Sequence, residues 1–373
     1  MKNGWHEKTV GDILQLEYGK PLDESDRKPN GRFPVYGANG EKDRTDKFYH
    51  DKPSIIVGRK GSAGEINLTE KKFWPLDVTY FVTFDERQHD LRFLYYLLTT
   101  LELTKLAKGV KPGINRNEVY SQVTRVPSLA EQRQIVGILD EAFEGLATAK
   151  ANAEQNLQNA RALFESHLQA VFAIQTQHVA LSELATDITD GDHLPPPKAP
   201  TGVPFITISD IVKKTREIDF NNTFTVPEHY FQKLKPHKKP IVGDVLYTVT
   251  GATLGIPVLV KKQIDFCFQR HIGLIRPKAS TDSVWLSYAM LSPQVFRQAT
   301  VGSTGTAQKT VSLAVLRNIS VPKIPLSEQR SIAAKFDALS AETQRLESLY
   351  QRKLAALDEL KKSLLHRAFS GQL

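Results

Sequence analysis

Basic and amide side chains gather beside glycines in three loop-like segments of this sequence. Glycine has no Cβ, so its backbone can come close to a phosphate or a groove. Arg and Lys donate to phosphate oxygens, while Arg, Asn and Gln also match the edges of guanine and adenine. We therefore take these segments as candidate nucleic-acid contacts, with ordinary surface-loop chemistry as the alternative. The residues are Arg59 and Lys60 before Gly61, Lys111, Asn115 and Arg116 around Gly113, and Gln308 and Lys309 after Gly305.

Motifs for catalysis are missing from the sequence. It contains no GxxxxGK[ST] phosphate loop, no Asn-Pro-Pro-aromatic tetrapeptide and no GxSxG nucleophile elbow. The one nuclease-like fragment, Glu70-x-Lys72, lacks a partner aspartate with its preceding proline. The 10 histidines show no pair at metal spacing, and the single Cys267 excludes an internal disulfide and a multi-cysteine zinc site. We expect a chain with neither catalytic activity nor a bound metal.

The positive charge of the chain is unevenly distributed. The chain has 373 residues, a length that predicts two or three domains, and 40% of them are hydrophobic, which is enough to form their cores. Its net charge is +8. Residues 1–127 have 21 Lys and Arg against 18 Asp and Glu, 128–174 have 3 against 6, 175–325 have 17 against 11, and 326–373 have 8 against 6. Excess positive charge in the first and third segments is typical of a protein that binds a polyanion, with a solvated basic surface as the alternative. We see no signal peptide or membrane span and expect a cytoplasmic protein.

A seven-residue motif occurs twice and divides the chain. LAEQRQI at Leu129–Ile135 returns as LSEQRSI at Leu326–Ile332, and the offset of 197 between Glu131 and Glu328 holds for roughly forty residues. Each copy follows a longer, more divergent stretch. The chain therefore has the order variable block, shared segment, variable block, shared segment.

Each shared segment predicts a helix of about 40 residues, about 60 Å long at about 1.5 Å per residue. Ser128 and Glu131 form a capping-box signature after Pro127, which predicts where the first helix begins. Apolar residues at three-four spacing predict a coiled coil, in which the smaller side chains of one helix pack against bulkier ones of the other. Core helices of one globule are the alternative. The predicted seam is Ile135, Leu139, Ala142, Leu146, Ala149, Ala153, Leu157, Ala160, Leu163 and Leu168 against Ile332, Phe336, Leu339, Leu346, Tyr350, Leu357, Leu360 and Leu364, with Thr343 and Lys353 as polar interruptions.

The two variable blocks share an outline of strands and turns. Near the end of each block we expect an aromatic core helix, from Phe93 and from Trp285. Three stretches of the first block parallel stretches of the second: 31–40 with 202–210, 58–64 with 248–255, and 74–82 with 266–275. One scaffold with different loops would recognise two different targets. Short β-branched runs predict strands at Ser54–Val57, Thr79–Val82, Phe205–Ile208, Val245–Val249 and Ile256–Val260.

This arrangement resembles the specificity subunit of type I restriction-modification enzymes over nearly the whole chain. The resemblance implies an α+β fold, with two similar target-recognition domains of mixed β-sheet and helices at 1–127 and 175–325. Two long antiparallel coiled-coil helices, 128–174 and 326–373, would join them in a pseudo-twofold arrangement. The phrases that carry the resemblance are LEYGKPL at Leu16–Leu22, PVYGANG at Pro34–Gly40, IIVGRKGSAG at Ile55–Gly64, TDGDHLPPP at Thr189–Pro197 and PFITISDI at Pro204–Ile211.

The resemblance also implies a function. In that family each recognition domain reads one half of a split, asymmetric site in double-stranded DNA through the major groove, and the helices set the gap. The subunit has no chemistry of its own. It binds two methyltransferase subunits and, in the full complex, translocating endonuclease subunits. S-adenosylmethionine, ATP and Mg²⁺ are then expected on those partners, and no cofactor is expected on this chain.

We accordingly expect DNA contacts from both blocks. The turn that carries Lys20 differs from the matching turn that carries His193, so contacts should not be transferred between blocks there. Two other functions stay open: a coiled-coil adaptor with two β-rich protein-binding domains, and a nuclease or methyltransferase acting alone. The candidates are Arg59, Lys60, Arg116, Arg270 and Lys309 for phosphate or guanine, Asn39, Asn115 and Gln308 for adenine, and Lys20, Lys111, Thr250 and His271 as further contacts.

Overall fold

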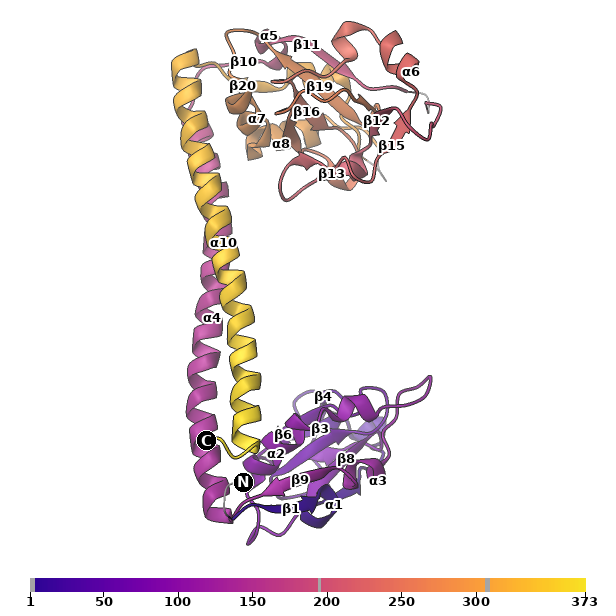
Figure 1. Cartoon of the computed structure of the whole chain (residues 1–373), viewed down its shortest axis with the longest axis vertical. Helices are drawn as coiled ribbons and strands as arrows, with labels where there is room; N and C mark the ends of the chain where they lie inside the picture. The colour runs from indigo at the N-terminus through magenta and orange to yellow at the C-terminus, as the bar shows by residue number, and fades with distance from the viewer. Residues whose placement is uncertain (1–3, 194–195, 306–308) are drawn as a thin grey trace. The chain divides into compact units, whose positions relative to one another are not determined.

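The chain forms two compact units in the computed structural model, which describes residues 4–193, 196–305 and 309–373 (Figure 1). Unit 1 runs up to Glu154 and also includes Gln351–Leu373, while unit 2 is Gln155–Tyr350. Two long helices, α4 (Leu129–Ala173) and α10 (Leu326–Phe369), each contribute one part to each unit. Each unit therefore combines one variable block with segments of both shared helices.

Unit 1 is built on a four-stranded antiparallel sheet in the order β2-β8-β5-β6. These strands are Gln15–Tyr18, Thr79–Thr83, Ser54–Gly58 and Ile66–Thr69. A second sheet has the order β4-β3-β7 (Gly40–Thr45, Phe33–Gly37, Trp74–Pro75), and β1 (His6–Thr9) pairs with β9 (Val123–Val126). The helices of the block are α1 (Val10–Ile13), α2 (Leu91–Thr100) and α3 (Arg116–Tyr120), with single 3₁₀ turns at Glu24–Asp26 and Leu103–Leu106.

Unit 2 repeats these sheets. Its four-stranded sheet has the order β11-β19-β16-β17 (Ala185–Asp190, Ile272–Pro277, Val245–Thr248, Pro257–Leu259). The smaller sheet is β15-β12-β18 (Phe224–Val226, Val203–Ile206, Cys267–Phe268), and β10 (His178–Ala180) pairs with β20 (Ser320–Pro322). The remaining elements are the hairpin β13 (Ile211–Val212) and β14 (Glu217–Ile218), the helices α5 (Leu181–Leu184), α6 (Glu228–Lys233), α7 (Ser283–Leu291), α8 (Pro293–Val301) and α9 (Leu313–Asn318), and 3₁₀ turns at Ile208–Asp210, Pro236–Lys238 and Gly251–Thr253.

The sheets of the two blocks correspond strand for strand, which confirms the predicted α+β fold and the shared scaffold. In both smaller sheets the central strand pairs antiparallel on one side and parallel on the other. The predicted strands at 54–57, 79–82, 245–249 and 256–260 are present within one or two residues. The strand predicted at 205–208 instead ends at Ile206, and Ile208 already belongs to a 3₁₀ turn.

The aromatic helix predicted from Trp285 is two helices. α7 ends at Leu291, and α8 begins at Pro293, whose ring nitrogen has no hydrogen to donate to an earlier turn. Ser292 lies between them with its Oγ accepting a hydrogen bond from Val295 N at 3.3 Å. Trp285 and Phe93 are both fully buried, which confirms that these helices belong to the cores.

The long helices run antiparallel within each unit. In unit 1, Lys150 Nζ lies 2.8 Å from Asp358 Oδ1. In unit 2, Arg161 Nε lies 3.5 Å from Glu347 Oε2, and the Phe172 and Phe336 rings are stacked 5.9 Å apart. This pairing confirms the predicted coiled coil. Within the described residues, no helix is long and apolar enough to cross a membrane.

Two residues of the predicted seam are exposed. Leu163 is 49% and Leu360 is 47% accessible, so both were wrongly assigned to the seam. Successive helical residues lie about 100° apart, and in unit 2 it is the neighbouring Phe164 that contacts the Phe336 ring, at 6.0 Å. Conversely Thr343, predicted as a polar interruption, is buried with its Oγ donating to Leu339 O at 3.0 Å.

Candidate nucleic-acid interface

The predicted contacts of the first block lie at one end of the four-stranded sheet of unit 1. β2 ends at Tyr18, which pairs with Tyr80, and β5 ends at Gly58, which pairs with Thr79. The loops that continue from these strand ends carry Lys20, Arg59 and Lys60. Backbone pairing of Lys60 with Gly113 brings segment 111–116 to the same end. The structure thus joins residues that are far apart in the sequence.

Two arginines lie over the ring of one tyrosine at this sheet end. The Arg59 guanidinium lies 4.9 Å from the ring centre of Tyr18, and that of Arg116 lies 5.1 Å from it. Tyr18 also packs edge-on against the buried Tyr80, at 5.1 Å, and remains 44% exposed. Sequence reasoning missed Tyr18. Its place directly before the Gly-Lys turn was the available signal.

The other basic candidates of unit 1 are open to solvent. Lys60 and Lys111 are exposed and form no ion pair within residues 4–193, 196–305 and 309–373. Lys20 is exposed too, with its ammonium 5.0 Å from the ring centre of Tyr49. Cations without carboxylate partners are available to neutralise phosphates.

The two asparagines play different structural parts. Asn39 is exposed in the tight turn between β3 and β4. Asn115 is the N-cap of α3, and its Oδ1 accepts a hydrogen bond from Asn117 N at 2.9 Å. An adenine contact by Asn115 therefore has to share that oxygen with the cap.

The glycines of this sheet end serve two purposes. Gly61 has φ +81°, a conformation that favours glycine, and a Cβ there would meet no atom within 4 Å. A Cβ on Gly19 would lie 2.1 Å from Leu76 O, and one on Gly191 of unit 2 would lie 1.9 Å from Phe268 O. These two matched glycines are needed for close packing of the turn against the neighbouring backbone.

The matching sheet end of unit 2 carries the candidates of the second block. His271 O accepts a hydrogen bond from Val249 N at 2.9 Å, and Lys309 O accepts one from Gly251 N at 3.2 Å. Arg270 and Lys309 are exposed. Partial burial and the neighbouring Arg270 cation lower the pKa of His271 below its ordinary value, which favours the neutral imidazole.

The other two predicted contacts of the second block are Thr250 and Gln308. Thr250 is 2% exposed, pairs through its backbone with Thr310, and has a buried Oγ1 with no hydrogen-bond partner among the described residues. A contact between its hydroxyl and DNA requires this loop to open. Gln308 lies outside the described residues.

Acidic groups distinguish the second sheet end from the first. Asp190 Oδ2 lies 2.7 Å from His193 Nε2, and Asp192 Oδ2 accepts a hydrogen bond from the Tyr230 hydroxyl at 2.8 Å. Burial and this carboxylate raise the pKa of Tyr230. His193 is thus tied to a carboxylate, whereas Lys20 in the matching turn lies over an aromatic ring. One scaffold presents a basic aromatic surface in unit 1 and a mixed-charge surface in unit 2.

The glutamine of the repeated motif joins each block to its long helix. Gln132 is fully buried; its Oε1 accepts a hydrogen bond from Asp90 N at 2.9 Å, and its Nε2 donates to Pro127 O at 3.0 Å. Gln329 repeats the pattern with Asp282 N at 2.7 Å and Ile324 O at 2.9 Å. Asp90 and Asp282 are the N-caps of α2 and α7. The motif therefore positions the recognition block, a role that sequence reasoning missed although the repetition signalled it.

A second pair of matched contacts lies about two turns further along each long helix. The Tyr96 hydroxyl donates to Asp140 Oδ1 at 2.5 Å, and the Tyr288 hydroxyl donates to Asp337 Oδ1 at 2.7 Å. Burial, with the help of this carboxylate, raises the pKa of Tyr288 to about 12. Each aromatic helix is therefore fixed to its long helix at two points.

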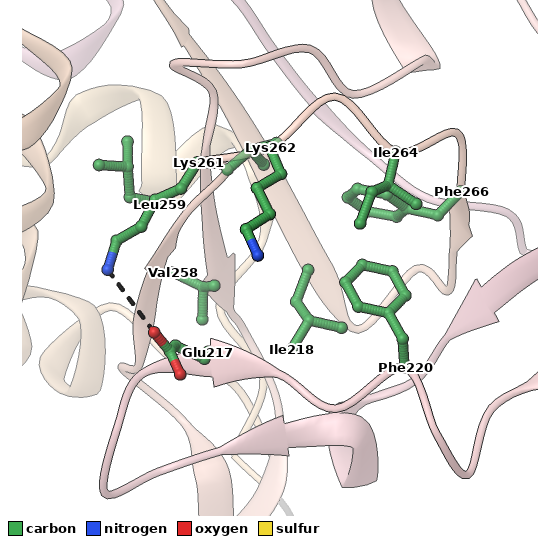
Figure 2. Close-up of a pocket in the computed structure, with 10 residues that line it drawn as sticks. Glu217, Ile218, Phe220, Val258, Leu259, Lys261, Lys262, Ile264 and Phe266 are labelled. Carbon is green, nitrogen blue, oxygen red and sulfur yellow. Dashed lines mark ion pairs between the residues drawn. The ribbon is translucent and has the colours of Figure 1, made fainter.

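The surface of unit 2 also has an apolar pocket of about 230 Å³ between β17, the loop that follows it and β14 (Figure 2). Ile218, Phe220 and Phe266 line it, and Lys261 Nζ lies 3.7 Å from Glu217 Oε1 at its rim. None of the predicted contact residues lines this pocket. In the part of the chain that the structure describes, no group of three or more His, Cys, Asp or Glu side chains could hold a metal ion.

Known proteins share this architecture. A family model described as the type I restriction modification DNA specificity domain matches residues 2–158 and 183–354. The chain is 28% identical over 173 residues to the type I restriction enzyme EcoBI specificity subunit of Escherichia coli, across 46% of this chain and only 36% of that protein. It is 21% identical over 406 aligned positions to the EcoDI specificity subunit of the same organism, across 99% of this chain and 88% of that protein. One solved structure comes from work on complex assembly and conformational transition of the type I R-M system. It superposes on this chain with a TM-score of 0.77 at 19% identity and covers 100% of this chain and 99% of the other. This match supports the fold.

Proposed function

Because the chain belongs to the type I restriction-modification DNA specificity family, we propose that it recognises a split DNA site, one half through each variable block. Residues 1–127 would read one half-site and residues 175–325 the other. A site read by two different surfaces is asymmetric. DNA recognition by the family favours this function over the adaptor that binds only proteins.

The observation that carries the proposal is the pair of matched sheet ends with different side chains. Arg59 and Arg116 stand at one end, and Arg270 with the Asp190–His193 pair stands at the other. The backbones that hold them are built alike. A common frame docks each block in a similar way, and the side chains that differ select different bases.

We further propose that the chain is a non-catalytic scaffold. Its long helices offer docking surfaces for two methyltransferase subunits and, in the full complex, for endonuclease subunits. S-adenosylmethionine, ATP and Mg²⁺ would be bound by those partners. The relatives are named as specificity subunits, and the sequence lacks the phosphate-loop and nucleophile motifs that an independent enzyme would need.

Exchange of one block tests the proposal directly. Residues 1–127 are replaced by the corresponding block of a relative, and the variant is expressed in a host with the methyltransferase partner. Long-read sequencing then maps the methylated adenines. We expect one half of the methylated motif to change and the other half, with the gap, to stay the same.

The reciprocal exchange of residues 175–325 is the matched control, and it should change only the other half. A change in both halves, or in neither, in an active hybrid would refute the modular assignment. Methylation by the methyltransferase partner without this chain would refute its role as the specificity component.

A further inference from the structure

Of the two arginines that the structure describes over the Tyr18 ring, Arg116 is the one whose guanidinium donates no hydrogen bond to the protein. Arg59 donates from Nη1 to Asp77 O at 3.0 Å, so part of its guanidinium is engaged with the protein. Within the described ranges, the guanidinium of Arg116 donates to no protein acceptor and forms no ion pair. Its contact is with the ring of Tyr18, which leaves the edges of the guanidinium unpaired.

Tyr18 holds this guanidinium in a defined place. Its own ring packs edge-on against Tyr80, which is 2% exposed, and the Arg59 guanidinium also lies over the Tyr18 ring. A guanidinium that lies over an aromatic ring is held there by cation–π attraction, and its N–H donors stay available to a ligand. Arg116 is also the first residue of α3, whose start is fixed by the Asn115 cap. Both ends of the side chain are therefore restrained before any ligand binds, which lowers the entropic cost of binding.

We propose that Arg116, positioned by Tyr18, reads a guanine in the half-site recognised by residues 1–127. A planar fork of two N–H donors matches the O6 and N7 acceptors of guanine in the major groove, and no other base offers that pair of acceptors. Arg116 contacts the base, and Tyr18 acts as a positioning residue. This inference rests on the proposed function and adds the identity of one base to it.

The neighbouring lysines have a different part in this surface. Lys60 and Lys111 are exposed point charges on flexible stems and lack the planar fork of arginine. They fit phosphates, which position the protein without selecting a sequence. Unit 1 therefore separates a base-reading group on an aromatic support from phosphate-binding groups around it.

The test uses the full chain assembled with its methyltransferase partner, after methylation mapping has identified the motif. Duplexes carry 7-deazaguanine in place of one guanine at a time, which removes N7 and keeps base pairing. With the unaltered chain, we expect one substituted duplex to bind about ten- to hundredfold more weakly than the unmodified duplex. In that duplex the 7-deazaguanine lies in the half-site recognised by residues 1–127. In Arg116→Ala, which removes every donor of the side chain, that duplex and the unmodified one should bind equally, and methylation should tolerate other bases at that position.

Further variants separate positioning from folding. Tyr18→Leu, which removes the ring, should lose more discrimination at this one base than Tyr18→Phe, which keeps it. Lys60→Gln is the matched control and should weaken binding to all duplexes alike. A half-site without guanine, or an Arg116→Ala complex that keeps the 7-deazaguanine effect, would overturn the inference while the proposed function stands. Absence of any sequence-specific methylation would instead refute the proposed function.

Discussion

Gln132 is a buried amide that hydrogen-bonds to the backbone on both sides of the block's junction with its long helix. We predict that Gln132→Ala lowers the free energy of unfolding by about 1–3 kcal/mol, because the partly buried Asp90 N and the buried Pro127 O lose their partner. Urea unfolding of the chain measures this difference. Gln329→Ala should behave alike, since Gln329 makes the same contacts in unit 2.

Gln134, two residues further along the same helix, is the matched control. Its side chain is exposed, so Gln134→Ala should change the free energy of unfolding by no more than about 0.5 kcal/mol. Equal effects of the two substitutions would show that the buried amide does not join the block to the helix.

Cys267 provides an independent check on the core of the second block. It is the only cysteine of the chain, it is fully buried in β18, and burial raises the pKa of its thiol to about 12. Because the thiolate is the reactive form, we predict that Ellman's reagent at pH 8 leaves the native chain unlabelled and labels one thiol per chain in guanidinium chloride. Rapid stoichiometric labelling of the native chain would contradict this burial.

Part of the candidate site could be predicted from single residues. Arg59, Lys60 and Arg116 attracted attention because they lie beside glycines, and the structure places them at one sheet end. Their contacts with DNA stay predictions. Tyr18 also precedes a glycine, but the sequence did not single it out, since its contact with Tyr80 depends on the pairing of β2 with β8, which lies far along the chain.

At the scale of elements, local sequence patterns predicted the strands and helices, but they did not predict all of the residues through which the two long helices contact each other. Glycine and proline punctuation predicted β5, β8, β16 and β17, because those signals act within a few residues. The order of the strands in each sheet arises from pairing between distant segments, which no local pattern encodes. Likewise, the three-four spacing assigned Leu163 to the seam, although Phe164 makes the contact in unit 2.

The contrast between buried and exposed residues predicts that substitutions in the two long helices of unit 2 lower the free energy of unfolding by unequal amounts. Phe336 is 1% exposed and packs on Phe164, Phe172 and Tyr288, so Phe336→Ala should lower the free energy of unfolding by about 3–5 kcal/mol. Leu163→Ser should cost no more than about 0.5 kcal/mol, because Leu163 is 49% exposed. Urea unfolding compares the two variants, and a larger loss for Leu163→Ser would contradict the packing described for unit 2.

For the whole molecule, net positive charge in both blocks predicts binding that depends steeply on salt. Each lysine that neutralises a phosphate contributes about one to the slope of log K against log salt concentration. We predict that Lys60→Gln with Lys111→Gln lowers this slope by about two and weakens binding to all sequences alike. Titration of the assembled complex with DNA at several salt concentrations measures it. An unchanged slope would show that these two exposed lysines do not contact phosphates.

Under the proposed function, the two long helices would set the gap between the half-sites. Lys150 lies opposite Asp358 in unit 1 and Arg161 lies opposite Glu347 in unit 2. Insertions after Glu154 and after Lys353 therefore fall between these two contacts in the sequence of each helix. Seven residues inserted at both points add two turns and keep the seam facing its partner. At about 1.5 Å per residue against about 3.4 Å per base pair, we predict that the gap lengthens by about three base pairs.

Methylation mapping of the double-insertion variant measures the gap, and the half-sites themselves should not change. Insertion into α4 alone is the control: it moves Arg161 away from Glu347 or Lys150 away from Asp358, so the two units cannot keep both sets of contacts. We expect that variant to lose methylation. An active double-insertion variant with an unchanged gap would show that the spacing of the half-sites is set elsewhere, by the methyltransferase subunits or by the DNA, and that the helices only join the blocks.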